Sequence, residues 1–415
     1  MKRRVVITGL GAITPIGIGK DEFWDALAAG KSGVGLITAF DTTDFNVKIA
    51  AEVKNFNFEN FGDKKEGRRM DRMSQFAVAA SKLAFADAKL DMEKEDAFRC
   101  GVCVGSGIGG LHTFTEQTWK FKEKGPRFVS PLFIPMILGN MASGEIAIAC
   151  GLKGVNFSVQ TACASGTHAL GSAFRSIVYG DADVMLAGGT EAVVNEMAVA
   201  GFANMKALST DNENYQKASR PFDATRNGFV LGEGAGVLVL EELSHAQKRG
   251  AYIYGELVGY GANCDAHHMT APDPTGEGAA MCFKMALQDA GLDAKDVSYI
   301  NAHGTSTQLN DKAETLAIKN VFGEYAKKIP VSSTKSMTGH LLGAAGGIEA
   351  IATILAMEKN ILPPTINYEN IDKENGLDLD YVPNKARNAQ IEVSLSNNLG
   401  FGGHNACVVF KKFAK

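Results

Sequence analysis

The chain has 415 residues, of which 45% are apolar and 21% charged, and its formal net charge is −4. This length exceeds one ordinary hydrophobic core, so two domains or two fused halves are expected. The slight negative charge gives no general attraction to nucleic acid or to an anionic membrane, and no apolar run approaches the ~18 residues of a spanning helix. Seven scattered cysteines fit a reducing compartment, so we expect a soluble cytoplasmic protein without membrane insertion.

Short β-branched runs alternate with longer amphipathic stretches along the chain. This alternation predicts an α/β fold, with helices on both faces of a sheet. The first series of expected strands is 5–8, 101–104, 155–160, 183–187 and 236–240, with helices at 74–88 and 166–179. In the second series, strands at 256–261, 297–301, 330–333 and 393–397 alternate with helices at 279–290, 312–321 and 341–358.

The two series follow the same order, which favours two similar halves. Residues 168–173 and 340–345 echo each other, because each begins with histidine, continues with small apolar residues and opens an expected helix. We therefore expect one half over residues 1–250 and a second over residues 251–415.

Cys163 lies where an expected strand meets an expected helix. Val155, Phe157 and Val159 alternate with polar residues, and the apolar positions after residue 166 have helical spacing. Free amide N–H groups at such a turn lower the pKa of a thiol and supply donors for an oxyanion on an attached acyl group. Buried free cysteines are also common and inert, so this segment alone leaves the role of Cys163 open.

Two histidines lie on further loops that follow strands. His303 comes after the strand 297–301, and His340 comes after the strand 330–333. Ligands bind at the carboxyl ends of strands in an open α/β sheet, and Cys163 lies at such an end too. A lone histidine is usually a satisfied core residue. Three reactive side chains on three equivalent loops instead predict one composite active site.

Two charged residues are candidates for orienting these histidines. We expect Lys335 and Glu314 to form a charged pair behind them, fixing tautomer and orientation. A helix N-terminus disfavours the imidazolium, so His340, just before an expected helix, should be neutral and act as a hydrogen-bond donor.

Four motifs together resemble the β-ketoacyl-[acyl-carrier-protein] synthases, in the order of that family and over essentially the whole chain. They are Thr161-Ala-Cys163-Ala-Ser-Gly, Asn301-Ala-His303-Gly-Thr-Ser-Thr, Lys335-Ser-Met-Thr-Gly-His340 and Gly400-Phe401-Gly-Gly. Among subtypes the chain is most similar to the elongating synthase II, and Ile108 supports this over type I. His404 departs from the threonine that many members have after the last motif.

The resemblance implies a thiolase-like fold with two βαβαβαβ halves in five αβαβα layers, usually as a homodimer. It also implies ping-pong chemistry in fatty acid elongation. Cys163 would receive an acyl group from acyl carrier protein. Malonyl-carrier protein would then lose CO₂, and its enolate would attack the Cys163 thioester.

The same resemblance implies a role for individual residues. His303 and His340 would hydrogen-bond the malonyl thioester oxygen. The backbone N–H groups of Cys163 and Phe401 would form the oxyanion hole, and Phe401 would act as a gate. Contacts with the acyl chain and the phosphopantetheine arm are implied for Ile108, Phe202, Thr270, Thr305, Thr307 and Phe401.

A basic cluster would dock the carrier. Lys65, Arg68 and Arg69 have helical spacing, which ordinarily marks a solvated face. The resemblance implies instead that they bind the acidic carrier protein together with Arg127 and Lys206.

No free cofactor and no required metal are implied, because the carrier brings the phosphopantetheine. A structural monovalent cation is described in relatives, at positions that match Asn301, Ala302, Glu349, Ser396 and Asn397.

Competing functions share parts of this pattern. A degradative thiolase needs a second catalytic cysteine in a Cys-x-Gly turn, whereas Cys407 falls in an apparent strand. A type III initiating synthase has asparagine where His340 stands. A polyketide ketosynthase has the same catalytic residues and stays open. A non-enzymatic chain-length factor lacks the active cysteine, so Cys163 argues against it.

Overall fold

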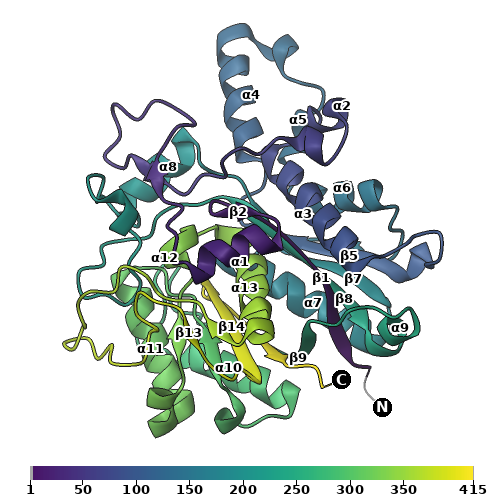
Figure 1. The fold of residues 1–415 in the computed structure, drawn as a ribbon. Helices are drawn as coiled ribbons and strands as arrows, with labels where there is room; N and C mark the ends of the chain where they lie inside the picture. Colours follow the sequence, from purple (N-terminus) through teal and green to yellow (C-terminus); the bar gives the residue numbers. More distant parts are fainter. Residues whose placement is uncertain (1–2, 415) are drawn as a thin grey trace.

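The centre of the molecule is an 11-stranded mixed sheet covered by helices, seen in the computed structural model, which describes residues 3–414 (Figure 1). The strands of its first half are β1 (Val5–Thr14), β2 (Gly17–Ile18), β5 (Cys100–Gly105), β6 (Asn156–Phe157), β7 (Val184–Glu191) and β8 (Gly234–Glu242). Those of its second half are β9 (Gly255–Cys264), β10 (Tyr299–Asn301), β11 (Val331–Ser332), β14 (Val393–Gly400) and β15 (His404–Lys411).

The strand order is the same in both halves. The sheet runs β11-β10-β14-β15-β9-β1-β8-β7-β5-β6, with β2 paired to β1. Leaving out the short β2 and numbering the other strands by their position within each half, both halves read 3-2-4-5-1 from the outer edge inward. The halves meet where β1 pairs antiparallel with β9. This repeat confirms the expected two similar halves and the α/β class.

The helices form three layers around the sheet. The main ones are α3 (Arg72–Ala88), α6 (Met141–Cys150), α7 (Ser165–Tyr179), α10 (Glu277–Ala290), α11 (Gln308–Phe322) and α13 (Ala345–Lys359). The outer layers are α3 with α6 and α10 with α11, while α7 and α13 pack against each other and against strands of both halves. The result is the five-layer αβαβα arrangement.

Strand alternation explains why the layers separate. On β7, Met185 and Ala187 belong to the core shared with α7, whereas Val184 and Leu186 belong to the core under α3. Both faces are apolar because both are covered, as in α/β folds generally. The middle layer is the most deeply buried, and residues 345–357 of α13 are all buried.

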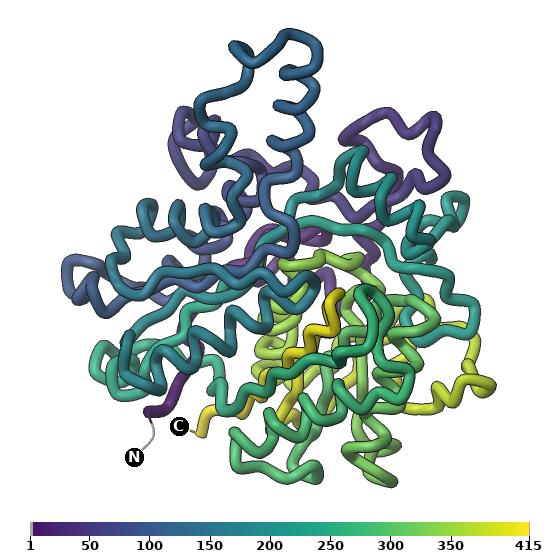
Figure 2. Tube along the Cα trace, turned by 180° about the vertical axis from the view of Figure 1, so that it is seen from behind, coloured from purple at the N-terminus to yellow at the C-terminus, as the bar shows by residue number. Residues whose placement is uncertain are grey.

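The remaining elements lie at the periphery. The helices are α1 (Lys20–Ala28), α2 (Lys64–Gly67), α4 (Leu111–Lys124), α5 (Phe133–Ile137), α8 (Glu196–Asn204), α9 (Leu243–Lys248) and α12 (Lys335–Thr338). Two small antiparallel sheets of two strands each pair β3 (Gly35–Leu36) with β4 (Ile49–Ala50) and β12 (Ile361–Leu362) with β13 (Arg387–Asn388). Helix α4 projects from the body in both views (Figures 1 and 2). Within residues 3–414, no helix has both the length and the apolar character needed to cross a bilayer.

Three details of the expected elements are wrong. The strand expected at 155–160 is only Asn156–Phe157, because the chain turns toward the buried Cys163. The helix expected from residue 341 begins at Ala345, after the 3₁₀ turn Leu342–Ala344. The echo of residues 168–173 with 340–345 is out of register, because His168 lies inside α7.

The true equivalence joins the two turns that precede α7 and α13. The 3₁₀ turn Ala162–Ala164 leads into α7 as Leu342–Ala344 leads into α13. Ala162 and Leu342 both adopt positive φ, at 49° and 46°, which non-glycine residues rarely do. Cys163 therefore corresponds to Gly343 of the second half.

Candidate active site

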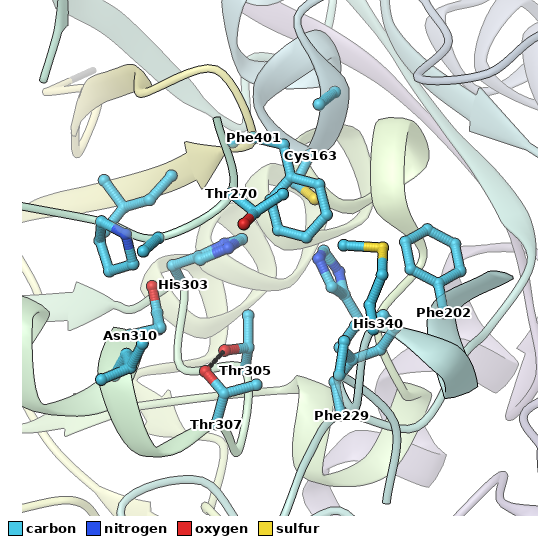
Figure 3. A pocket seen from close by; sticks show the side chains of 18 of the residues that line it. Cys163, Phe202, Phe229, Thr270, His303, Thr305, Thr307, Asn310, His340 and Phe401 are labelled. Carbon is cyan, nitrogen blue, oxygen red and sulfur yellow. Dashed lines mark hydrogen bonds between the residues drawn. The ribbon is translucent and has the colours of Figure 1, made fainter. Parts of the chain in front are cut away.

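One cavity of about 470 Å³ brings Cys163, His303 and His340 together. The cysteine comes from the first half and both histidines from the second. The imidazole rings lie 5.2 Å apart, centroid to centroid, at 85°. Figure 3 shows both rings directed into the space beside the thiol, with the ring of Phe401 next to it. The three predicted residues thus line one cavity.

Cys163 sits on a strained turn that presents its sulfur to the cavity. Ala162, with its positive φ, precedes it, and α7 begins two residues later. The backbone N–H groups of Cys163 and Phe401 both face the sulfur. Such a pair of N–H groups is the arrangement that can hold an oxyanion on a group attached to the sulfur.

The expectation of a lowered thiol pKa is wrong. Burial raises the pKa of Cys163 to about 12, and the Glu191 carboxylate adds to this. The Lys335 charge and the two backbone N–H groups oppose the shift without overcoming it. Desolvation of the thiolate therefore outweighs the turn, and the free enzyme holds a neutral thiol.

Hydrogen bonds fix the tautomer of His303. The Nδ2 amide of Asn398 lies 3.0 Å from His303 Nδ1 and can only donate, so Nδ1 accepts and the ring proton sits on Nε2. Asn398 is itself oriented, because its Nδ2 also donates to Glu349 at 2.8 Å and its Oδ1 accepts from the Thr167 hydroxyl.

His340 has the same tautomer for a different reason. The backbone N–H of Leu342 donates to His340 Nδ1 at 3.3 Å, which leaves the proton on Nε2. Burial and the nearby Lys335 charge hold the pKa of both imidazoles well below the usual 6.5. His340 is neutral as expected, but burial rather than a helix terminus is the main cause. Both rings are neutral donors.

The expected ion pair between Lys335 and Glu314 is wrong. Lys335 instead pairs with Glu349 of α13, and both side chains are almost fully buried. Glu314 accepts from the backbone N–H groups of His303 and Gly304, each at 2.7 Å. It therefore still orients His303, through the main chain. Burial raises the pKa of Glu314 to about 7.

Two residues of this network were not predicted from the sequence to contact the catalytic groups. Glu349 was named only for a cation site, and Asn398 was not named at all. The available signal for Asn398 was its place on the strand that ends at the Gly400-Phe401 motif, with its side chain on the same face of β14 as Ser396.

All six residues predicted to contact the substrate line the same cavity. Thr305 and Thr307 share a hydrogen bond of 2.9 Å between their hydroxyls, and Phe202 lies 6.5 Å from Phe401, ring to ring. The predicted residues that line the cavity, besides the three reactive side chains, are Ile108, Phe202, Lys206, Thr270, Thr305, Thr307 and Phe401.

The basic cluster lies outside the cavity and faces solvent. Lys65, Arg68 and Arg69 are all exposed at α2, and Arg127 is exposed beyond the end of α4. Within residues 3–414, none of these four forms an ion pair, whereas the neighbouring Lys64 pairs with Glu59.

The residues expected around a cation are adjacent, but one is already engaged. Asn301 and Ser396 are register partners on β10 and β14. The buried oxygens Ser396 Oγ and Asn397 Oδ1 find no hydrogen-bond partner among the described residues. Glu349, however, is occupied by Lys335 and Asn398. The neutral oxygens suit a monovalent cation, and the carboxylate does not contribute a free ligand.

Comparison with known proteins places these features in one family. The models of the beta-ketoacyl synthase N-terminal and C-terminal domains match residues 2–246 and 254–369. The 3-oxoacyl-[acyl-carrier-protein] synthase 2 of Staphylococcus aureus (strain COL) is 53% identical over 411 residues, covering 99% of both chains.

Two further proteins extend the comparison. The Synechocystis sp. protein of the same name is also 53% identical, with 99% of both chains covered. A type II polyketide ketosynthase, solved in complex with its acyl-carrier protein, is 37% identical with a TM-score of 0.93 and full coverage of both chains. By its matched models and its full-length relatives, this chain belongs to the beta-ketoacyl synthase family.

Proposed function

We propose that this chain condenses an acyl group held on Cys163 with a malonyl thioester on acyl carrier protein, giving 3-oxoacyl-[acyl-carrier protein] and CO₂. The observation that carries the proposal is the pair of neutral imidazoles, His303 and His340, whose Nε2–H donors belong to one cavity with the thiol. Two neutral donors suit an oxygen that becomes negative during the reaction.

Loading transfers the acyl group without net release of a proton. The Cys163 sulfur forms a bond to the acyl carbonyl carbon, and the N–H groups of Cys163 and Phe401 hold the resulting oxyanion. The bond to the pantetheine sulfur then breaks. That sulfur leaves with the proton given up by the neutral Cys163 thiol.

Condensation begins when the malonyl carbon–carboxylate bond breaks. Its electron pair moves into an enolate as CO₂ leaves, and the Nε2–H groups of His303 and His340 donate to the enolate oxygen. The enolate carbon attacks the Cys163 thioester, forming the new carbon–carbon bond. The cysteine sulfur leaves and takes up a proton from solvent, which restores the neutral thiol.

Lys335, Glu349, Glu314 and Asn398 serve this step as positioning residues. The buried Lys335–Glu349 pair fixes the carboxylate that orients Asn398, and Asn398 fixes the His303 tautomer. Glu314 holds the main chain at His303. In this proposal Ile108 and Phe202 contact the acyl chain, and Phe401 acts as a gate. The phosphopantetheine arm contacts Thr270, Thr305 and Thr307.

Fatty acid elongation is favoured over polyketide synthesis. The relatives that are 53% identical are named 3-oxoacyl-[acyl-carrier-protein] synthase 2, whereas the polyketide ketosynthase is 37% identical. A chain-length factor stays disfavoured, because Cys163 is present in a complete site.

The carrier protein is the proposed partner and brings the phosphopantetheine, so no free cofactor is included. Lys65, Arg68, Arg69 and Arg127 offer exposed unpaired charge to an acidic surface, and Lys206 lies at the cavity itself. A monovalent cation beside Ser396 and Asn397 is included as a structural component only. All seven cysteines are free thiols, which supports a cytoplasmic location.

A homodimer is also part of the proposal, with a second copy of this chain as the occupant of one apolar surface. Strand β6 ends the sheet, and its outer edge pairs with no strand of the described residues. Exposed apolar side chains gather on the preceding segment, where Phe128 is 60%, Ile134 57% and Ile148 76% exposed. Patches of this kind mark interfaces. Light scattering should give the mass of a dimer.

The function is tested by reconstitution. The purified chain is mixed with acyl-carrier protein and malonyl-carrier protein, and both CO₂ and 3-oxoacyl product are measured. We expect one CO₂ for each 3-oxoacyl product formed by the parent chain, and no 3-oxoacyl product from Cys163→Ala. Absence of 3-oxoacyl product from the parent chain would contradict the proposal.

A further inference from the structure

The carboxylate of Glu191 joins two loops of the active site that belong to different halves of the molecule. Glu191 is the last residue of β7 and is fully buried. In the first half, its carboxylate accepts from the Ser106 hydroxyl at 3.0 Å and from the backbone N–H groups of Gly107 and Ile108 at 2.7 and 3.2 Å. In the second half, it accepts from Gly343 N–H at 2.9 Å.

The contact is too close for other residues at the two glycines. A Cβ on Gly343 would lie 2.3 Å from Gly107 N, and a Cβ on either glycine would lie 2.7 Å from the Glu191 carboxylate. The loop of Ile108 and the loop after His340 are therefore packed against each other through this carboxylate.

Burying the Glu191 carboxylate is unfavourable in free energy, because the group loses its hydration. Among residues 3–414 it has no ion-pair partner, and its carboxylate accepts from neutral donors alone, whose hydrogen bonds oppose the rise in its pKa that burial causes. An unpaired buried charge loses its hydration, and only its hydrogen bonds offset that loss. Three of its four donors belong to the loop that carries Ile108, and the fourth belongs to the loop that follows His340. Glu191 can therefore fix the position of these two loops relative to each other.

We propose that Glu191 is a positioning residue that holds the Ile108 wall of the acyl cavity in register with the His340 loop, and thereby supports the use of long acyl chains. This rests on the proposed function. A long acyl chain contacts more of the wall than a short one, so a displaced wall should penalise long substrates more. Displacements of about 1 Å near reacting groups can change rates by ~10²-fold.

The main variant is Glu191→Gln, which keeps the shape but turns an amide NH₂ toward N–H donors. We expect the ratio of kcat/KM for long over short acyl-carrier substrates to fall about tenfold or more. Ser106→Ala removes one of the four donors and should move the ratio in the same direction by less. This milder variant tests the proposal even where Glu191→Gln does not fold.

Glu52→Gln is a matched control. Glu52 is also a buried carboxylate that accepts backbone N–H groups, from Thr38 and Ala39, but it lies outside the cavity. It should lower stability without moving the ratio.

A second readout needs no carrier substrate. The Glu191 charge raises the pKa of Cys163, so alkylation of Cys163 by iodoacetamide at pH 8 should become severalfold faster in Glu191→Gln and stay unchanged in Glu52→Gln. An unchanged long-to-short ratio in both Glu191→Gln and Ser106→Ala would overturn the proposal. Absence of product from the parent chain would instead contradict the proposed function.

Discussion

The Nδ2 amide of Asn398 lies 3.0 Å from Nδ1 of His303, and this contact decides which ring nitrogen of the histidine carries the proton. Because an amide nitrogen only donates, the ring must present Nε2–H as its remaining donor. Asn398 owes its own orientation to Glu349 and Thr167. The catalytic donor is therefore set by a chain of buried contacts that begins on α13 and ends in the cavity.

Removing the donor should separate the two half-reactions. His303→Ala is expected to lose ~10²-fold or more in condensation, because the enolate oxygen loses a hydrogen bond, while Cys163 still becomes acylated. Asn398→Asp should act in the same way, because a carboxylate would draw the ring proton to Nδ1 and leave Nε2 as an acceptor.

Loading is followed by intact-protein mass and condensation by 3-oxoacyl product. An equal fall in both steps for either variant would show that the histidine does not act specifically on the enolate.

The buried thiol predicts an unusual pH profile for alkylation. With the pKa of Cys163 raised to about 12, the thiolate fraction increases about tenfold per pH unit throughout pH 7 to 10. The logarithm of the alkylation rate by iodoacetamide should therefore rise with a slope near one and show no plateau in this range. A plateau beginning near pH 7 would mean that the turn stabilises the thiolate after all.

The basic cluster should act on carrier binding alone. Reversing Lys65, Arg68 and Arg69 to glutamate is expected to raise KM for carrier-bound substrate, most strongly at low salt, because exposed charges act on association and are screened by ions. Turnover of a small acyl-pantetheine substrate should hardly change.

Its matched control reverses Lys295, Lys327 and Lys328, which are exposed, lie away from the cavity and give the same change in net charge. If the cluster variant also loses turnover of the small substrate, the cluster is structural.

Ile108 should limit the length of the acyl group. It lines the cavity on a turn between Gly107 and Gly109. Because these two sequence neighbours have no side chains, Ile108 is the only residue of the three that fills space there. Ile108→Phe is expected to retain short substrates and lose those longer than about eight carbons, since overpacking costs roughly 1–3 kcal/mol. The ratio of kcat/KM for long and short substrates measures this. Ile371→Phe, on an exposed site outside the cavity and away from the proposed dimer surface, is the control, and equal ratios in both variants would remove Ile108 from the acyl wall.

Much of the fold and site could be read from local patterns. The strand before His303 and the helix after Cys163 are short-range features, because period-2 and period-3.6 apolar patterns identify them directly. The grouping of Cys163, His303 and His340 also followed from a general property of α/β sheets.

Side-chain partners across the structure could not be read in this way. Glu314 and Glu349 were both candidate partners of Lys335 in the sequence. Only the packing of α13 shows that Lys335 forms its ion pair with Glu349. The pKa of the Cys163 thiol depends on the balance between burial and nearby donors. The turn alone therefore predicted a lowered pKa, whereas burial raises it. Register between the two repeats likewise required the positions of Ala162 and Leu342 in space.

The most direct test of the account is the covalent acyl group. The chain is incubated with acyl-carrier protein, and the intact mass and the proteolytic peptides are measured for the parent, for Cys163→Ala and for Cys264→Ala, which removes an exposed thiol beside the Gly402 loop. The parent and Cys264→Ala should each gain one acyl mass on the peptide containing Cys163, and Cys163→Ala should gain none. An acyl group found on Cys264 or Cys407, or retained in Cys163→Ala, would contradict the account.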